Sequence, residues 1–490
     1  MKRGWWRGKN IGPAVHNVTM IPSSERRIGQ ARFAMYVAEG RRLLGITGAG
    51  EARSGFTGEP GAAGTLFCPL DQGNAKRLRE VFPFTAPAPL AGQAVTFGVG
   101  DRLGIAGPGH LRALRRYQAA PVLAQQSVRE LELMGRDYEQ VLDAATWAVF
   151  QEGYDRPWGA DGDHLKTEEW VRTALRAGFT MITADVSEHI HQQFLAIPLA
   201  ELRGAYQALD PAYRTRIERA YLSLRLALDT GEAVGFTEET LARTALVYRE
   251  ALEHSLRLYR AALEVRPAFD FELSVDETST PTTPAAHAFV ALEAQAAGIR
   301  VSSLAPRFIG EFQKGIDYLG DPPSFERSLS THAAVARALG HRLSVHSGSD
   351  KFSVFPAVGR QTRGRFHLKT SGTSWLEAVR VIAACEPKMY RELHARALEG
   401  FPAARRYYHV TPELSAIPDV KKLSDAELPG LLAQRDSRQL VHITYGEVLR
   451  DAAFKEQFLT ALQRHLEEYW AALERHIGRH LDLLAVPRAG

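Results

Sequence analysis

Short apolar segments that end in clusters of polar residues recur along this chain, and they limit its fold more than any other feature. The clearest covers residues 343–345 and is followed within six positions by His346, Ser347, Ser349, Asp350 and Lys351. Similar segments end at residues 100–102, 161–164, 183–185, 276–278, 306–307 and 369–371. Seven short strands with polar carboxyl ends and helical sequence between them are typical of a (β/α)8 barrel of the TIM type. We therefore expect an α/β fold with its site at the carboxyl ends of the strands.

The eighth strand is less clearly marked than the other seven. Seven strands are expected at residues 95–99, near 161–164, and at 179–184, 269–275, 300–305, 343–345 and 366–369. For the eighth, residues 440–443 are favoured and residues 407–410 are the alternative. Residues 188–265 contain helical sequence, in which Asp210 followed by Pro211, and Thr237, start helices. This predicts a helical insertion after the third strand, which we expect to cover the barrel mouth.

The length of the chain and its distribution of glycine and proline indicate one large domain with additions at both ends. A chain of 490 residues is long enough to bury one barrel core. Residues 1–90 are rich in Gly and Pro and are expected to flank the barrel, which occupies residues 91–490. Residues 453–484 predict an amphipathic C-terminal helix that either closes the barrel or binds a second subunit, so a homo-oligomer is one of two alternatives.

The charge balance and the absence of several motifs narrow the function. Sixty basic residues oppose 56 acidic ones, which does not indicate a nucleic-acid partner. No run of 18 apolar residues occurs, so no membrane span is expected, and the basic N-terminus lacks the apolar region of a secretory signal. These features favour a cytoplasmic enzyme with two reduced cysteines, Cys68 and Cys385. No dinucleotide-binding, Walker or GxSxG motif occurs. The sequence therefore does not favour an enzyme that uses a nucleotide cofactor or a serine hydrolase.

Two histidines at strand ends are candidate metal ligands. His164 follows Asp163, and the pair predicts a metal ligand beside a general base; a cap and a surface histidine are the alternative. His346 is the strongest candidate, because hydroxyl donors and a carboxylate follow it directly. Gln313 offers a neutral oxygen as a further ligand, although its loop is equally consistent with a solvated helix start. Two histidines with oxygen ligands suit a divalent ion such as Mn²⁺, Ni²⁺, Co²⁺ or Zn²⁺.

Glu272 is predicted to face the barrel interior. Alternation along residues 269–277 puts Glu272, Ser274 and Asp276 on one face and apolar side chains on the other. A buried carboxyl group without a partner has a raised pKa, which would make Glu272 an acid near neutral pH. The alternative is an ion pair between Glu272 and Lys369 or Arg307.

Positive charge gathers at the same end of the expected barrel. Arg102, Arg307, Lys351 and Lys369 predict an anionic or polyhydroxylated small molecule as the partner, and Lys314 is a further cation for an anionic substrate. Residues 347–349 are candidates for cradling an anion through their backbone N–H groups. Asp276 and Glu277, at the mouth, are candidates for binding substrate hydroxyls or for a second metal ligand.

Several of these segments resemble the tagaturonate epimerase family, which interconverts tagaturonate and fructuronate. They are residues 97–104 (FGVGDRLG), 161–164 (DGDH), 275–278 (VDET), 305–310 (APRFIG), 314–318 (KGIDY) and 346–351 (HSGSDK), and the likeness spans roughly residues 95–385. The resemblance implies a metal-dependent sugar-acid epimerase built on a barrel. It also implies related activity on the ketohexoses fructose and tagatose, at carbon 4.

The resemblance further implies roles for individual residues. Asp163 and Glu272 become the proton-transfer pair, with Glu277 in place of Glu272 if the strand register is shifted by one. His164, Gln313 and His346 become the metal ligands. The residues expected to bind the substrate are Asp101, Arg102, Glu277, Arg307, Lys314, Ser347, Asp350, Lys351 and Lys369.

The chemistry expected of such an enzyme follows from the position of the inverted carbon. This carbon lies β to the ketone, where simple enolisation does not make its C–H bond acidic. We therefore expect retro-aldol and aldol steps, in which the metal polarises the ketone and Asp163 accepts the hydroxyl proton. Removal and return of hydride is the competing chemistry, for which no nicotinamide site is visible. A barrel aldolase that releases its fragments and a non-catalytic sugar-binding barrel are the alternative functions.

Overall fold

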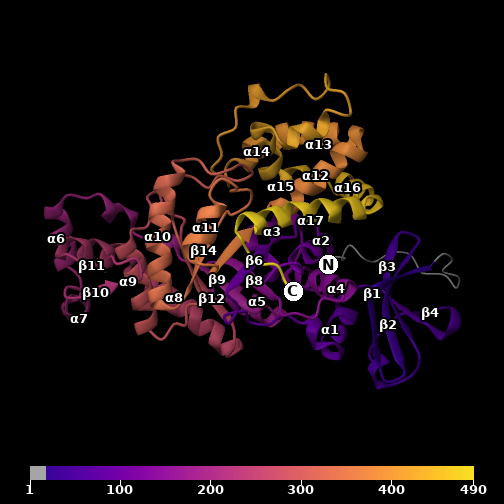
Figure 1. The fold of residues 1–490 in the computed structure, drawn as a ribbon, viewed down its shortest axis with the longest axis horizontal. Coiled ribbons are helices and arrows are strands. Elements are labelled where there is room, and N and C mark those ends of the chain that lie inside the picture. Colours follow the sequence, from indigo (N-terminus) through magenta and orange to yellow (C-terminus); the bar gives the residue numbers. More distant parts are fainter. Residues whose placement is uncertain (1–17) are drawn as a thin grey trace.

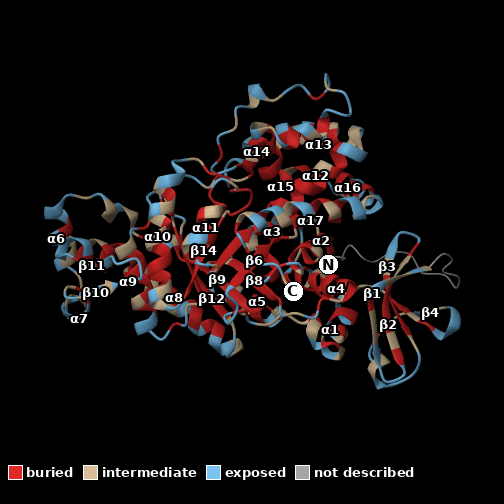
Figure 2. Ribbon diagram, in the orientation of Figure 1, coloured by how far each residue is buried: buried red, intermediate tan, exposed pale blue. Residues whose placement is uncertain are grey.

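The computed structural model describes residues 18–490, and a closed parallel barrel lies at its centre (Figure 1). Its strands are β6 (Val95–Val99), β7 (Ala120–Ser127), β8 (Gly159–Leu165), β9 (Met181–Asp185), β12 (Asp270–Val275), β13 (Ser303–Pro306), β14 (Arg342–Val345) and β15 (Phe366–Thr370). β15 pairs with β6 in parallel, and this ladder closes the barrel. The predicted (β/α)8 fold is confirmed, with the strands buried at its centre (Figure 2).

One barrel strand was not predicted, and one predicted strand is wrong. The missing strand is β7, whose sequence APVLAQQS is buried almost throughout and therefore lacks the alternation of a half-exposed strand. Residues 440–443 belong to the helix α14 (Arg435–Ile443), and residues 407–410 lie outside helices and strands. The periodicity of a short buried apolar run does not distinguish a strand from a helix.

Helices alternate with the strands and surround the barrel. They are α2 (Gly107–Leu114), α3 (Val128–Met134), α4 (Tyr138–Glu152), α5 (Glu168–Ala177), α8 (Glu238–Val265), α9 (Pro284–Ala296), α10 (Pro322–Leu339), α11 (Phe355–Thr362) and α12 (Thr373–Cys385). One continuous apolar core joins most of their inner faces to strand side chains such as Phe97, Phe271 and Leu343. This core holds the carboxyl ends of the strands in fixed positions relative to one another.

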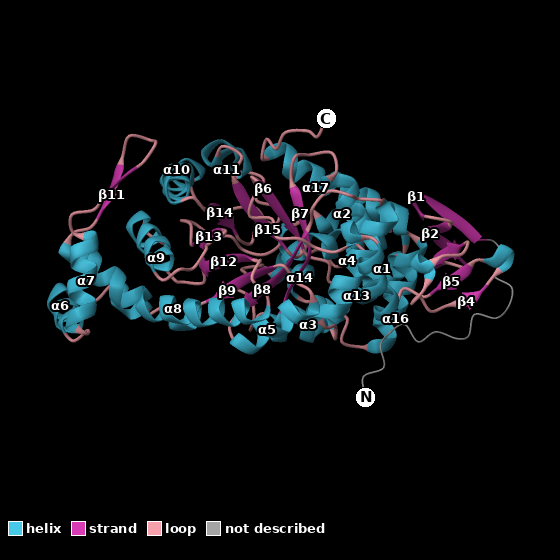
Figure 3. Cartoon of the chain, turned by 90° about the horizontal axis from the view of Figure 1, so that it is seen from below, coloured by secondary structure: helices cyan, strands magenta, loops and turns pink. Residues whose placement is uncertain are grey.

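The insertion predicted at residues 188–265 follows β9, which is the fourth barrel strand once β7 is counted. It contains α6 (Leu199–Gln207), α7 (Pro211–Tyr221), a hairpin of β10 (Arg225–Ala227) and β11 (Ala233–Gly235), and α8. Asp210 and Thr237 cap α7 and α8, as predicted. Apolar residues of this block pack on α9 and α10, so it extends outward from the ring of helices (Figures 1 and 3) instead of covering the mouth.

An N-terminal extension of strands flanks the barrel. β1 (Val18–Ile28), β2 (Ala31–Ala38), β3 (Arg41–Thr47), β4 (Glu59–Pro60) and β5 (Leu66–Cys68) form an antiparallel sheet in the order β1-β2-β3-β5-β4, followed by α1 (Gln72–Val81). The core of this unit, which includes Phe33 and Phe82, packs against Trp147 and Phe150 of α4. The basic residues 1–7, and with them the prediction about a secretory signal, lie outside the described residues.

A second helical layer packs against α2 and α12. It consists of α13 (Pro387–Ala404), α14, α15 (Tyr445–Val448), α16 (Ala452–Arg464) and α17 (Leu466–Leu483). The single helix predicted for residues 453–484 is in fact two helices, which are separated at His465. α17 packs along α2 and also contacts α12, so it covers one side of the barrel. Among residues 18–490, no helix is long and apolar enough to cross a bilayer.

Candidate active site

A cavity of about 540 Å³ opens at the carboxyl ends of the barrel strands. Among the predicted site residues, it is lined by Arg102, Asp163, His164, Glu277, Arg307, Gln313, Lys314, His346 and Ser347, and Asp276 lies beside them. The other predicted residues, Asp101, Glu272, Asp350, Lys351 and Lys369, are not on its wall. The predicted set therefore divides into residues that border the pocket and residues that lie behind it.

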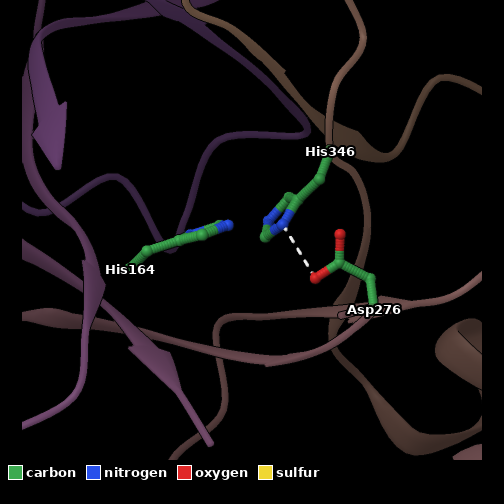
Figure 4. A group of neighbouring side chains, drawn as sticks. All are labelled: His164, Asp276 and His346. Carbon is green, nitrogen blue, oxygen red and sulfur yellow. Dashed lines mark ion pairs between the residues drawn. The ribbon is translucent and has the colours of Figure 1, made fainter. Parts of the chain in front are cut away.

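Three pocket residues come close enough together to hold one metal ion (Figure 4). His164 lies at the end of β8, Asp276 follows β12 and His346 follows β14. The ligand atoms of the three residues lie within 4.8 Å of one another, and the centres of the two imidazole rings are 5.0 Å apart. Two imidazole nitrogens and one carboxylate oxygen suit a divalent transition metal and leave coordination positions open for a substrate.

The hydrogen bond of His346 determines which of its nitrogens faces this group. Nε2 lies 2.6 Å from Glu272 Oε1, so its N–H donates to that carboxylate. In the neutral ring the lone pair is then on Nδ1, which faces Asp276 Oδ1 at 3.2 Å (Figure 4). A lone pair that faces a carboxylate needs a cation there, either a proton or a metal. Because metal-bound histidines commonly donate their other N–H to a carboxylate, these residues fit a bound metal ion.

The backbone of His164 adopts an unusual conformation at the pocket. Its φ angle is +54°, in the left-handed region that residues other than glycine rarely adopt and that is enriched at functional sites. Its Nδ1 lies 3.1 Å from Asp163 Oδ1. Burial lowers the pKa of His164, but Asp163 outweighs burial and raises that pKa to about 10. A metal must displace this proton, because only the neutral imidazole is a ligand.

Glu272 lies inside the barrel as predicted, but the prediction of a raised pKa is wrong. Its carboxylate accepts a hydrogen bond from Ser303 at 2.5 Å and pairs with Lys369 at 3.2 Å. Burial raises the pKa of Glu272, yet the positive charges of Lys369, His346 and His367 outweigh burial and hold that pKa well below its usual range. The alternative of an inward glutamate paired with Lys369 is therefore the one observed.

Lys369 is the centre of a charge cluster inside the barrel. Its Nζ lies 2.5 Å from Asp163, 2.9 Å from Asp161 and 3.2 Å from Glu272, and it donates a hydrogen bond to Thr183. Only 4% of the residue is exposed. Since three carboxylates already surround this ammonium group, it is poorly placed to bind an anionic substrate.

Two further residues predicted to bind substrate instead hold loops in place. Lys351 is fully buried and its Nζ donates to three backbone carbonyls, two in the loop after β13 and one in its own loop, at 2.7 to 2.9 Å. Asp101 accepts from two backbone N–H groups of the loop that follows it. Both residues do follow strands, but their side chains turn back onto the backbone and away from the pocket.

Asp350 belongs to a second group of potential ligands, together with His476 and His480 of α17. His476 Nε2 lies 2.5 Å from Asp350 Oδ1, and Arg438 also pairs with this carboxylate. His480 donates from Nδ1 to the carbonyl of His476 and accepts at Nε2 from the N–H of Asp350. A guanidinium group and hydrogen bonds thus occupy the atoms that a metal would need, and the group ties α17 to the loop after β14.

Gln313 lines the pocket, but its amide oxygen is engaged elsewhere. Oε1 accepts a hydrogen bond from Thr411 at 3.0 Å and another from Gln439 at 2.9 Å. Asp276 is the oxygen donor that lies beside the two histidines. It follows β12 directly, so its place at the mouth was predictable, whereas its closeness to His346 depends on how the barrel closes.

Part of the pocket wall carried no signal in the sequence. Tyr407, Tyr408 and His409 line the pocket from an irregular segment after α13. Arg129, on α3, also lines it, and its guanidinium group lies over both tyrosine rings at 5.8 and 5.7 Å from their centres. Tyr407, Tyr408 and His409 do not follow a barrel strand, and Arg129 follows β7, the strand that was not predicted, so the search for polar strand ends did not find them.

Comparisons with known proteins agree with this architecture. The family model of tagaturonate epimerase matches residues 22–484. A Thermotoga maritima protein named tagaturonate/fructuronate epimerase is 45% identical over 420 residues, which cover 86% of each chain. Two crystal structures of fructuronate-tagaturonate epimerase from Cohnella laeviribosi, one native and one with glycerol, have a TM-score of 0.93 and 47% and 48% identity, over 96% of this chain and 97% of theirs. The chain therefore belongs to the tagaturonate epimerase family and is an enzyme of the isomerase class.

Proposed function

We propose that this chain is a metal-dependent epimerase that interconverts tagaturonate and fructuronate. The observation that carries the proposal is the convergence of His164, Asp276 and His346 from three strand ends in one polar pocket. Family membership supports the reaction class. The activities for which the Thermotoga and Cohnella proteins are named support the choice of substrates.

His164, Asp276 and His346 would hold the metal ion, and Mn²⁺, Ni²⁺, Co²⁺ and Zn²⁺ all suit this ligand set. When bound, the ion supplies Lewis-acid polarisation of the substrate ketone. Glu272 supports this role by accepting the Nε2–H of His346, which keeps Nδ1 available to the ion. Gln313 serves as a further ligand only if its two present hydrogen-bond donors release its oxygen.

Asp163 is the proposed base. Burial raises its pKa, but Lys369 and His164 outweigh burial and hold that pKa well below its usual range, so the carboxylate is ionised at the pocket wall. Asp163 accepts the proton of the hydroxyl on the carbon β to the ketone. The bond between this carbon and the α carbon breaks, which leaves an aldehyde and an enediolate. After the aldehyde turns over, the bond re-forms on its other face and Asp163 returns the proton.

The second carboxylate of the proton-transfer pair is either Glu272, favoured by the sequence, or Glu277. Glu277 lines the pocket, and its Oε1 lies 3.8 Å from His164 Nε2. Glu272 lies behind His346 and is fully buried. These positions favour Glu277 for direct proton transfer and Glu272 for orienting His346. Substitution of a residue in the first role should lower turnover, whereas substitution of a residue in the second role should weaken metal affinity.

The same steps invert carbon 4 of fructose to give tagatose, because that carbon also lies β to a ketone. We include this ketohexose activity in the proposal as a slower reaction. The uronate is expected to react faster because cations line the pocket.

Proton NMR of the purified, metal-loaded protein with fructuronate tests the proposal. The expected result is formation of tagaturonate without loss of total sugar acid, which stops after exhaustive chelation and resumes when a divalent ion is added. Three-carbon fragments would identify an aldolase, and saturation-transfer signals without turnover would identify a sugar-binding barrel. Tagaturonate formation at the full rate after chelation would overturn the metal dependence.

A further inference from the structure

The cations on the pocket wall differ in whether a carboxylate of the protein already pairs with them. Arg102 pairs with Glu130 at 2.9 Å, and Lys166 pairs with Glu188 at the same distance. Arg307 and Lys314 line the same pocket, yet no carboxylate among residues 18–490 lies within 4 Å of either side-chain cation. Arg129 also lacks a carboxylate partner, but it donates to the carbonyl of Tyr407 and lies over two tyrosine rings. Arg307 and Lys314 are therefore the cations beside the candidate metal group that are most available to an anionic part of the substrate.

We propose that Arg307 and Lys314 form a subsite that binds the carboxylate of the uronate substrate and thereby selects the sugar acid over the neutral sugar. This inference rests on the proposed function, since it names the part of the substrate that the subsite recognises. A guanidinium group can donate two parallel hydrogen bonds to a carboxylate, and an ammonium group adds a third, charged donor.

Lys314 is directed toward the reaction centre by a hydrogen bond to another side chain. Its Nζ donates to Ser347 Oγ at 2.9 Å, and Ser347 directly follows the candidate ligand His346. A hydroxyl partner leaves the charge of the ammonium group uncompensated. The remaining N–H donors of Lys314 can therefore bind a carboxylate without first breaking an ion pair.

Arg307 directly follows β13, at the start of the same loop that carries Lys314. Val275 of β12 pairs with Pro306 of β13, so Asp276 and Arg307 begin adjacent loops at the mouth. The backbone of Arg307 is held in both directions by Thr282, through hydrogen bonds of 3.0 and 2.9 Å. Its side-chain Nε is buried and has no hydrogen-bond acceptor within the described part of the chain. Arg307 lines the pocket without a carboxylate partner, so the terminal N–H groups of its guanidinium remain available to a bound carboxylate.

Side chains from the outer helical layer brace the loop that carries Lys314. Arg438 of α14 donates to the carbonyl of Gly315 at 2.7 Å, and Gln439 donates to the carbonyl of Lys314 at 3.2 Å. Lys351 holds the same loop through the carbonyl of Ile316 at 2.7 Å. The ammonium group is thus positioned before substrate binds, which lowers the entropic cost of recognition.

The test compares fructuronate with fructose in the metal-loaded enzyme. Lys314→Met and Arg307→Gln are each expected to lower kcat/KM for fructuronate by about 10- to 100-fold, the effect of losing one charged hydrogen bond. Turnover of fructose and bound metal are expected to stay near the wild-type values. Lys166→Met is the matched control, because this lysine lines the same pocket but is already paired, and it should leave the ratio of the two sugars unchanged.

A second measurement covers the case in which fructose is not turned over. Gluconate and glucitol differ mainly in one carboxylate, and neither has to react in this measurement. Their competitive inhibition constants against fructuronate therefore measure how much the subsite contributes to binding. Lys314→Met and Arg307→Gln should each weaken the binding of gluconate by about 10-fold or more and leave the binding of glucitol unchanged. Equal losses for acid and neutral sugar, or an unchanged ratio in both variants, would overturn the subsite. A wild-type enzyme that forms no tagaturonate would instead overturn the proposed function.

Discussion

Two groups in this molecule each contain one aspartate and two histidines, but only one of them borders the pocket. His346 belongs to the first and Asp350, four residues later, to the second. In the second group Arg438 pairs with Asp350, and a backbone N–H and a backbone carbonyl engage the two nitrogens of His480. In the first group the lone pair of His346 faces a carboxylate and requires a cation. The capacity to bind a metal thus depends on which atoms remain unsatisfied, and residue types alone do not reveal it.

Substitution of one histidine in each group tests this comparison most directly. His346→Ala should remove both bound metal and epimerase activity, with a loss greater than the roughly 10- to 100-fold typical of residues that only orient a ligand. His480→Gln should leave the metal content unchanged. Metal analysis, epimerisation of fructuronate and circular dichroism on both variants check this. Loss of metal from His480→Gln with an intact fold would mean that the second group is also a metal site.

Asp163→Asn separates proton transfer from metal binding beside the first group. The substitution keeps the size of the side chain but removes the base, so turnover should fall by about 10²–10⁴-fold while metal remains bound. Activity assays at saturating metal, together with metal analysis, measure both quantities. If Asp163→Asn turns over fructuronate at nearly the wild-type rate, another group is the base.

Glu272→Gln and Glu277→Gln distinguish the residue behind His346 from the one on the pocket wall. Glu272→Gln should weaken metal affinity by about 10- to 100-fold and regain activity when metal is added in excess. Glu277→Gln should lower turnover at every metal concentration. A Glu272→Gln variant that stays inactive at saturating metal, beside an active Glu277→Gln variant, would restore Glu272 as the proton-transfer residue.

Asp350→Asn should have the smallest effect on turnover and a clear effect on stability. Breaking a buried ion-pair network by removing one partner costs about 3–5 kcal/mol of unfolding free energy. Burial raises the pKa of Asp350, but Arg438 and His476 outweigh burial and hold that pKa well below its usual range. The folded state therefore gains stability from this carboxylate above its ordinary pKa of about 3.9 and loses it as the pH falls toward the lower folded value.

Denaturant unfolding across this acidic range measures the predicted dependence. The wild-type protein should lose stability more steeply on acidification than Asp350→Asn, because the asparagine cannot titrate. Parallel curves for the two proteins would show that Asp350 contributes no linked proton.

The barrel and the location of its mouth were predictable because polar residues directly after an apolar strand are a local signal. His164, Asp276 and His346 all carry this signal, and the closed barrel brings them together. The strand β7 was missed although Gln125, Gln126 and Ser127 end its apolar run, because burial on both faces leaves it without the alternation of a half-exposed strand. Side-chain direction was also not predictable: Lys351 and Asp101 share the position of true pocket residues but turn onto the backbone.

The predicted set of cations illustrates the same limit. Charge counts alone could not separate Lys314 from Lys369, because the loop after β13 and the carboxyl end of β15 lie at the same end of the barrel. The difference lies in partners from distant parts of the chain, since three carboxylates from β8 and β12 surround Lys369. The resemblance to the epimerase family correctly identified the family, while the position of Glu272 behind His346 depends on contacts that only the folded chain reveals.

The closure of the barrel by its last strand also has a consequence for biosynthesis. A ribosome delivers Asp161, Asp163 and Glu272 long before Lys369, whose ammonium group balances their charge. The side chains that brace the loop of Lys314 arrive later still, at Arg438 and Gln439. Burying several carboxylates without a counter-charge is costly. The nascent chain therefore has no finished pocket to offer, and the proposed metal ion can bind only after nearly all of the polypeptide has been made.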